Sequence, residues 1–569
     1  MPACSDLHAP FLIAYKQICR ARRAKCDNEK PCSYCRRIGA TCSSEPISAT
    51  AGFDPASLAI LAKLEELQSG MESLSGHLQR PPSHSPNATL VAQESIHTIS
   101  PVQAPLALRL DRHLQRGNIS QVLAWDIWQP HELPQCLTAG EDEPGANPTS
   151  FSRARTSVLD QGPDISLFTG YLDAFFSNVH VLNPVLAEQQ IRAQLSSFQL
   201  NGIGWDADSF LLLLVLANGA SSSQFGELSM TGSTSGLDEQ RWANAQALFD
   251  AAEKRKDTLW RSDYLTQARC HFYSGMFMMV SMRPFDAWRH FLQGLATCQR
   301  STASAPRRSP RDPAHVEKQA KESIYWSCWK SERELRFELD MPNFSSAGYD
   351  HPIMFPTLPQ QVFDQEQLRA WYFYLAEISL WRSEMTARKT LSEFVRQQPG
   401  ALEALAERIG DLEESLTFWR ASLPDAISLD AGLQSSRADV LHFVLHGRLT
   451  YNYEVLTWPF LETQLLFGEH RTARASELAA KGVRVHYDRL SINRAGFYYR
   501  HHGTWLMQRS SARSACILLA VARSKSSDLL PTGWQEIVSD TIAMLEYWSE
   551  TPDDETIVFL KSVFLEFMQ

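Results

Sequence analysis

Residues 16–42 read KQICRARRAKCDNEKPCSYCRRIGATC, and this stretch decides how the N-terminal part of the chain folds. Its five cysteines have the spacing Cys19-x6-Cys26-x5-Cys32-x2-Cys35-x6-Cys42. A Cys-x2-Cys pair lets two thiolates from one turn contact the same ion, and tetrahedral zinc prefers thiolate ligands. A reduced peptide of this length has no other evident way to fold. The spacing therefore predicts a small zinc module.

The same stretch is strongly basic. It contains eight Lys or Arg residues against Asp27 and Glu29, so it carries +6, whereas the whole chain carries −10 and the remainder therefore −16. A compact basic patch on an acidic chain indicates a local site for a polyanion. A helical turn after Cys19 would display several cations together, as contacts with the DNA major groove and phosphates require. These cations are Arg20, Arg22, Arg23 and Lys25.

Three motifs resemble the fungal binuclear zinc cluster family: Cys19-Arg-Ala-Arg-Arg-Ala-Lys-Cys26-Asp27, Lys30-Pro31-Cys32-Ser-Tyr-Cys35 and Gly39-Ala-Thr-Cys42. In that family six cysteines hold two zinc ions, and two of the cysteines bridge both ions. The resemblance implies that Arg22 and Arg23 read bases, usually in CGG-type half-sites. It implies that Arg20 and Lys25 serve phosphates or the surroundings of the cluster.

One position departs from the family pattern. The first family cysteine is expected three residues before Cys19, where this chain has Lys16. That cysteine is a bridging ligand, so each zinc keeps only three thiolates without it. Cys4 could loop back across 14 residues, the cluster could have been lost, or the residues before about Ile18 could come from a wrong exon or start site. We favour the last explanation, because the match begins abruptly there.

A short helix is expected after the zinc module. Asp54 is a favourable N-cap and Pro55 suits the first helical position, while Pro81 and Pro82 end the helix. The apolar residues advance in steps of 4, 3, 4, 3 and 4, which is a heptad pattern. They are Ile60, Leu64, Leu67, Met71, Leu74 and Leu78. Residues 54–79 are thus predicted to be a dimerisation helix, and the alternative is a helix that packs on its own chain.

The rest of the chain is predicted to be a linker over 80–154, with a large α-helical domain over 155–569. Alternating strand patterns are nearly absent, and apolar residues recur at helical spacing. Long helical segments are predicted near 262–281, 284–299, 316–339, 365–392, 401–422, 437–467, 472–523, 533–549 and 554–567. The expected fold class is mostly α: a zinc-cluster module, a short coiled-coil helix and a large all-α regulatory domain.

The helical domain resembles the middle homology region of the same family. The resemblance is carried by Met282-Arg-Pro-Phe-Asp-Ala-Trp-Arg289 and Tyr325-Trp-Ser-Cys-Trp-Lys-Ser-Glu332. It implies a domain that senses a small-molecule effector or holds the regulator silent. The aromatic residues Trp288, Tyr325, Trp326 and Trp329 are expected in the core. For Glu332, Glu334, Arg336 and Glu338 we expect a solvated or ion-paired helix face, with a buried polar network as the alternative.

No enzyme and no membrane segment are expected. Walker, Rossmann, zinc-protease and nucleophile-elbow motifs are all missing from the sequence. His501 and His502 on a helix would point about 100° apart, so a structural or surface pair is expected rather than a metal site. The apolar runs Leu211–Ala217 and Ala515–Ala522 are too short to span a bilayer. Together these features predict an intracellular protein, and the resemblance places it in the nucleus.

The sequence thus predicts a transcription factor of the fungal zinc cluster type. It would bind two zinc ions and double-stranded DNA with CGG-type half-sites as a homodimer. It would respond to a small-molecule effector and regulate RNA polymerase II transcription of metabolic or biosynthetic genes. The alternative is a helical ligand-binding or interaction protein whose degenerate zinc head no longer binds DNA, and Lys16 is the feature that favours it.

Overall fold

The computed structural model describes Arg36 and residues 118–129, 164–226, 239–301, 313–342, 352, 355–358, 364–397, 402–430, 439–468, 472–549 and 554–567. The chain divides into two units, Met1–Ala92 and Gln93–Gln569. Arg36 is an exposed helical residue of the first unit, and all other described residues belong to the second. Every regular element among the described residues is a helix, which confirms the predicted α fold class.

The first part of the helical unit packs around the apolar helix formed by residues 207–220. Its α-helices are α6 (Phe168–Asn178), α7 (Glu188–Asn201), α8 (Ala207–Ala220), α9 (Glu239–Glu253), α10 (Tyr264–Val280), α11 (Pro284–Ser301) and α12 (Pro313–Glu338), and short 3-10 turns lie at η3 (Ile165–Leu167), η4 (His180–Leu182) and η6 (Lys256–Arg261). Residues Phe210–Ala220 of α8 are all buried, and α8 packs against α6, α9 and α10. This burial explains why their sequence is apolar on every face.

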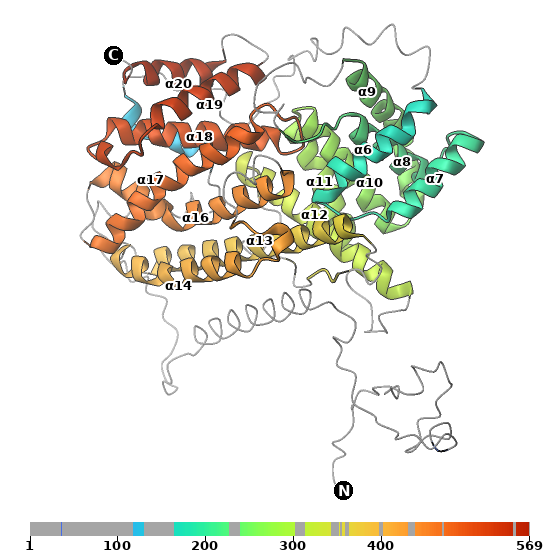
Figure 1. Ribbon diagram of the computed structural model, residues 1–569, viewed down its shortest axis with the longest axis horizontal. Coiled ribbons are helices and arrows are strands. Elements are labelled where there is room, and N and C mark those ends of the chain that lie inside the picture. Colours follow the sequence, from blue (N-terminus) through green and yellow to red (C-terminus); the bar gives the residue numbers. More distant parts are fainter. Residues whose placement is uncertain are drawn as a thin grey trace, which may run out of the picture. The chain divides into compact units, whose positions relative to one another are not determined.

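The second part is a stack of longer helices. It comprises α13 (Gln365–Gln397), α14 (Leu402–Ala421), α16 (Val440–Phe467), α17 (Ala473–Asn493), α18 (Thr504–Arg523), α19 (Trp534–Trp548) and α20 (Glu555–Leu565), with the turns η7 (Asp425–Ile427), η8 (Arg494–Gly496) and η9 (Ser527–Leu529). α16 packs against α13 and α17, and α18 packs against α17 and α19. Figure 1 shows α6–α11 on one side of the unit and α14–α20 on the other.

The segment predicted as one long helical stretch over 472–523 is two helices, so that prediction is corrected. The chain leaves the helical path between α17 and α18 because two contacts hold it elsewhere: Tyr499 Oη donates to Ser223 O at 3.2 Å, and Arg500 Nη1 donates to Val280 O at 2.9 Å. A Cβ at Gly496 would lie 2.6 Å from Phe443 Cζ, so glycine permits this close approach. Through these contacts the segment between α17 and α18 connects the two parts of the helical unit.

Residues 118–129 were predicted to be linker, and the structure corrects this. They form α5 (Ile119–Leu123) and η1 (Asp126–Trp128), which pack against α18. The Trp125 ring lies 5.7 Å from that of Trp458 in α16, and the Trp128 ring meets Phe559 of α20 edge-on at 5.4 Å. These light-blue residues therefore belong to the helical unit (Figure 1), because both tryptophans are buried against its helices.

The expected core residues are largely buried. Trp288, Trp326 and Trp329 are buried, whereas Tyr325 is half-buried. Of the scattered cysteines that were expected inside, four are buried: Cys270, Cys298, Cys328 and Cys516. The fifth, Cys136, lies outside the described residues. A free buried cysteine behaves as a small apolar side chain, which accounts for the burial of these four residues.

Candidate DNA-binding head and buried charge network

The predicted site residues of the N-terminal unit lie outside the described residues. This applies to the zinc ligands Cys19, Cys26, Cys32, Cys35 and Cys42, to the DNA contacts Arg20, Arg22, Arg23 and Lys25, and to the dimerisation residues Ile60, Leu64, Leu67, Met71, Leu74 and Leu78. It applies equally to Lys16 and Cys4. Their roles stay predictions. Within the part of the chain that the structure describes, no group of three or more His, Cys, Asp or Glu residues could hold a metal ion.

The described histidine pairs are structural. His501 and His502 lie in the break between α17 and α18, not on a helix, which corrects the geometry expected for them. The His501 ring stacks on Tyr499 at 4.8 Å, and burial lowers its pKa to about 4. His271 and His290 face each other at 5.9 Å across α10 and α11. Burial, helped by the nearby Lys256 charge, lowers their pKa values to about 4 and about 3, so both rings stay neutral at pH 7.

The charged residues near the end of α12 are mostly buried, so the expectation of a solvated face is wrong and the buried alternative holds. Glu332, Arg336 and Glu338 are each less than a tenth exposed. Glu332 accepts a hydrogen bond from Trp288 Nε1 at 3.2 Å and pairs with Arg336 Nε at 3.1 Å. Glu334 differs, because 40% of its side chain remains exposed. Most of the charged side chains near the end of α12 therefore lie inside the helical unit.

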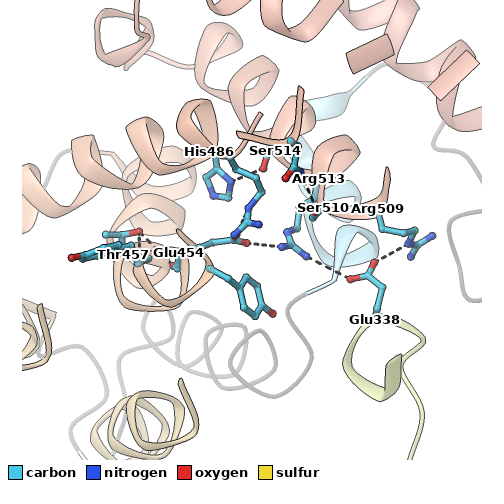
Figure 2. Close-up of polar contacts among 12 residues, drawn as sticks. Glu338, Glu454, Thr457, His486, Arg509, Ser510, Arg513 and Ser514 are labelled. Carbon is cyan, nitrogen blue, oxygen red and sulfur yellow. Dashed lines mark hydrogen bonds and ion pairs between the residues drawn. The ribbon is translucent and has the colours of Figure 1, made fainter. Parts of the chain in front are cut away.

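Glu338 begins a chain of ion pairs that runs into the core. Its carboxylate lies 2.8 Å from Arg509 Nε and 3.6 Å from Arg513 Nη1, both in α18. Arg513 Nη2 then lies 2.8 Å from Glu454 Oε1 of α16, and Arg489 of α17 donates to Glu454 Oε2 at 3.0 Å. Figure 2 shows Glu338 and Glu454 on either side of Arg513. The chain thus ties α12 to three helices of the second part.

A second set of ion pairs lies on α13. Glu384 is fully buried and lies 2.8 Å from Arg388 Nε and 3.5 Å from Arg448 Nη1 of α16. The Arg448 guanidinium stacks over the Trp381 ring at 3.5 Å and also lies 3.6 Å from Glu334. Lys330 of α12 pairs with Glu377 of α13. These contacts fix α13 against both α12 and α16.

Tyr451 of α16 joins the two sets. Four guanidinium groups lie between 5.4 and 5.8 Å from the centre of its ring, and they belong to Arg388, Arg448, Arg489 and Arg513. The ring face attracts cations, so Tyr451 supports guanidinium groups that would otherwise repel one another. Arg388 Nη2 also donates to Tyr451 Oη at 2.8 Å. The tyrosine is half-buried, whereas the four arginines are buried.

The pKa directions follow from these surroundings. Burial disfavours a charged guanidinium, but attraction to Glu454, Tyr451 and Glu338 together outweighs burial and raises the pKa of Arg513. Burial and repulsion from Arg336 lower the pKa of Arg333 to about 9. Burial raises the pKa of Glu334, although Arg448 opposes the shift. The negative groups around Arg513 therefore outweigh the effect of its burial on the pKa, whereas Glu332 and Glu384 only partly oppose that effect at Arg333.

The comparison with known families concerns the first unit. Residues 17–50 match the family model of the fungal Zn(2)-Cys(6) binuclear cluster domain. The match begins directly after Lys16 and includes all five cysteines from Cys19 to Cys42. No curated protein matches the sequence. Within the described residues, no helix has both the length and the apolar character needed to cross a bilayer.

The chain therefore joins an N-terminal segment that is similar to a zinc-cluster domain to an α-helical unit. The similarity to the fungal Zn(2)-Cys(6) binuclear cluster domain covers 34 of the 569 residues, and it supports the interpretation of the chain as a DNA-binding transcription regulator.

Proposed function

We propose that this chain is a nuclear, sequence-specific regulator of RNA polymerase II transcription that acts on metabolic or biosynthetic genes. The observation that carries the proposal is the zinc-cluster match over residues 17–50, which coincides with the +6 segment of a chain of net charge −10. A local positive patch on an acidic chain favours the binding of a polyanion such as DNA. The acidic helical unit then serves as the regulatory part, and it responds to a small-molecule effector.

In this proposal five cysteines and a sixth thiolate hold two zinc ions. The five are Cys19, Cys26, Cys32, Cys35 and Cys42. Arg22 and Arg23 read the bases of a CGG-type half-site, while Arg20 and Lys25 serve phosphates. The helix over 54–79 pairs two heads, so the connector between Cys42 and Asp54 sets the half-site spacing.

A second candidate function rests on Lys16. If no sixth thiolate completes the cluster, the head does not bind DNA and the chain acts through its helical unit as a ligand-binding or interaction protein. Two measurements on a fragment of residues 1–80 separate the candidates: its zinc content and its mobility shift on a CGG-bearing duplex. Zinc near two ions with a specific shift supports the regulator, whereas a metal-poor fragment that leaves the duplex unshifted supports the alternative.

The roles of two cations in the head can be distinguished by mutation. Arg23→Ala is expected to cost roughly 1–3 kcal/mol of specific binding and to relax discrimination at the half-site. Lys25→Ala is expected to weaken binding to all sequences and to lower the salt slope by roughly one unit. Titrations on cognate and scrambled duplexes at several salt concentrations measure both effects. Equal loss of specific and non-specific binding in both variants would contradict the assigned roles.

Dimerisation is expected to depend on the helix over 54–79. Leu67→Asp places two carboxylates against the apolar heptad seam, so the dimer-sized complex with a two-half-site duplex should disappear while zinc content stays unchanged. Sedimentation with and without the duplex measures this. Because Gly70 and Gly76 interrupt a helix of under three heptads, we expect weak pairing in solution and stronger pairing on DNA. A monomer on DNA that is insensitive to Leu67→Asp would show that the helix packs on its own chain.

A further inference from the structure

Two of the buried cysteines lie against each other, one on each of two adjacent helices. Cys298 lies one helical turn before the end of α11, and Cys328 lies in α12. Both are free thiols, and the Cys328 thiol donates a hydrogen bond to the sulfur of Cys298. Packing as small apolar side chains explains why each cysteine is buried, but it does not require the two sulfurs to meet. The contact between the thiols is therefore a separate feature of the fold.

A glycine lets the two helices come close at this point. A Cβ at Gly294 of α11 would lie 2.8 Å from Cys328 Sγ, so a larger residue there would displace the sulfur. Gly294 and Cys298 are four residues apart and therefore share the face of α11 that Cys328 contacts. Helix axes usually pack about 8–10 Å apart, and a residue without a side chain brings the backbones nearer, as a disulfide requires. Trp288 of α11 also donates to Glu332 of α12 at 3.2 Å, which holds the two helices in this register.

We propose that Cys298 and Cys328 are a redox-active dithiol, which hydrogen peroxide converts to an intramolecular disulfide between α11 and α12. In the first step the sulfur of Cys298 attacks one peroxide oxygen, the O–O bond breaks, and a sulfenic acid and one water are formed. In the second step the sulfur of Cys328 attacks the sulfenic sulfur, the S–S bond forms, and the hydroxyl leaves as a second water with the remaining thiol proton. The two sulfurs lose two electrons, and the peroxide gains them.

The surroundings of the two sulfurs set the order and the rate of these steps. Cys298 is 5% exposed and lies near the end of α11, whereas Cys328 is 0% exposed, so the oxidant reaches Cys298 first. Burial, together with the hydrogen bond to Cys298, raises the pKa of the Cys328 thiol, so Cys328 acts as the second, resolving thiol. Burial disfavours the reactive thiolate, so the first step is slow and needs sustained oxidant. The second step joins sulfurs that already touch, so the sulfenic acid should not accumulate.

This inference goes beyond the proposed function, because it concerns the helical unit and can be tested without DNA. The full-length protein is treated with hydrogen peroxide over a time course, its free thiols are alkylated in denaturant, and its tryptic peptides are identified by mass spectrometry. Trypsin releases Cys298 in the peptide 290–300 and Cys328 in the peptide 322–330, each with a single cysteine. We expect a disulfide-linked pair of these two peptides that dithiothreitol removes. This readout separates the pair from any oxidation of the N-terminal cysteines.

Two variants and one control test the pair. Cys298→Ser should abolish the linked peptides, whereas Gly294→Ala keeps both thiols but places a methyl group against Cys328 Sγ and should lower their yield at least about threefold. Cys516→Ser removes a thiol of α18 that is 0% exposed, and it should leave the yield unchanged. The oxidised protein should melt at a higher temperature than the reduced protein, and Cys298→Ser should lack this gain. Two thiols that stay free throughout the time course, or over-oxidation of Cys298 beside a free Cys328, would overturn the proposal.

Discussion

Glu454→Gln is expected to lower the free energy of unfolding of the helical unit by about 3–5 kcal/mol. The Glu454 side chain is 3% exposed and its carboxylate compensates both Arg489 and Arg513, at 2.8 Å from each. Glutamine keeps the shape but removes the charge, so two buried guanidinium groups lose their shared counter-ion. Urea denaturation of the full-length protein, followed by tryptophan fluorescence and circular dichroism, measures the loss.

The matched control is Glu536→Gln on α19. Its side chain is 71% exposed and lies 3.4 Å from Arg494 Nη2, so the same chemical change is made at a solvated ion pair. Exposed pairs contribute about 0–1 kcal/mol, and this variant should stay within that range. A cost for Glu454→Gln no larger than that of the control would show that water or another group compensates the two arginines.

The helices could be predicted because their signals are local. Apolar residues at helical spacing give most elements to within a few residues, and acidic or hydroxyl N-caps mark several starts. Asp263 accepts from Leu265 N and Thr266 N at the start of α10, and Asp554 caps α20 in the same way. Each cap satisfies backbone donors that the first helical turn leaves free, so the sequence alone indicates where the helix begins.

The corrections concern segments whose structure depends on distant residues. Nothing local ends a helix decisively before Arg494, and the break there exists because Tyr499 and Arg500 reach residues more than 200 positions away. Residues 118–129 are too short to show a long helical pattern, yet Trp125 and Trp128 pack against rings in α16 and α20. Tertiary contacts override weak local preference in both places.

The charge network was only partly foreseeable, for a related reason. On α12, spacing alone cannot distinguish a solvated face from one covered by other helices. One sequence signal does indicate a buried ion pair. Arg513 is the charged residue in the small and apolar run Ser511–Val521, and an isolated charge in a buried helix needs a partner of opposite charge. Pairing it with Glu338 and Glu454 still required the fold, because those residues are far apart in sequence.

The zinc head is the reverse case, because the metal and DNA chemistry proposed for it depends on 27 contiguous residues, 16–42. If no other group supplies the sixth thiolate, Lys16→Cys restores the family's first ligand position and raises the zinc content from below two ions per chain to two. Structural zinc contributes about 10–16 kcal/mol of binding free energy to small domains. Completing the bridged cluster should therefore also stabilise the head and give a specific shift of CGG-bearing DNA.

Two further variants decide between the explanations for Lys16. Gln17→Cys adds a thiol one residue away from the family spacing and should not raise the zinc content, because the bridging position demands a specific place around both ions. Cys4→Ser lowers the zinc content of the present sequence only if Cys4 is the sixth ligand. The number of zinc ions per chain is measured by mass spectrometry on the full-length protein for each of the three variants. Two ions per chain before any change, unaffected by Cys4→Ser, would mean that another group completes the cluster and that Lys16 is no defect.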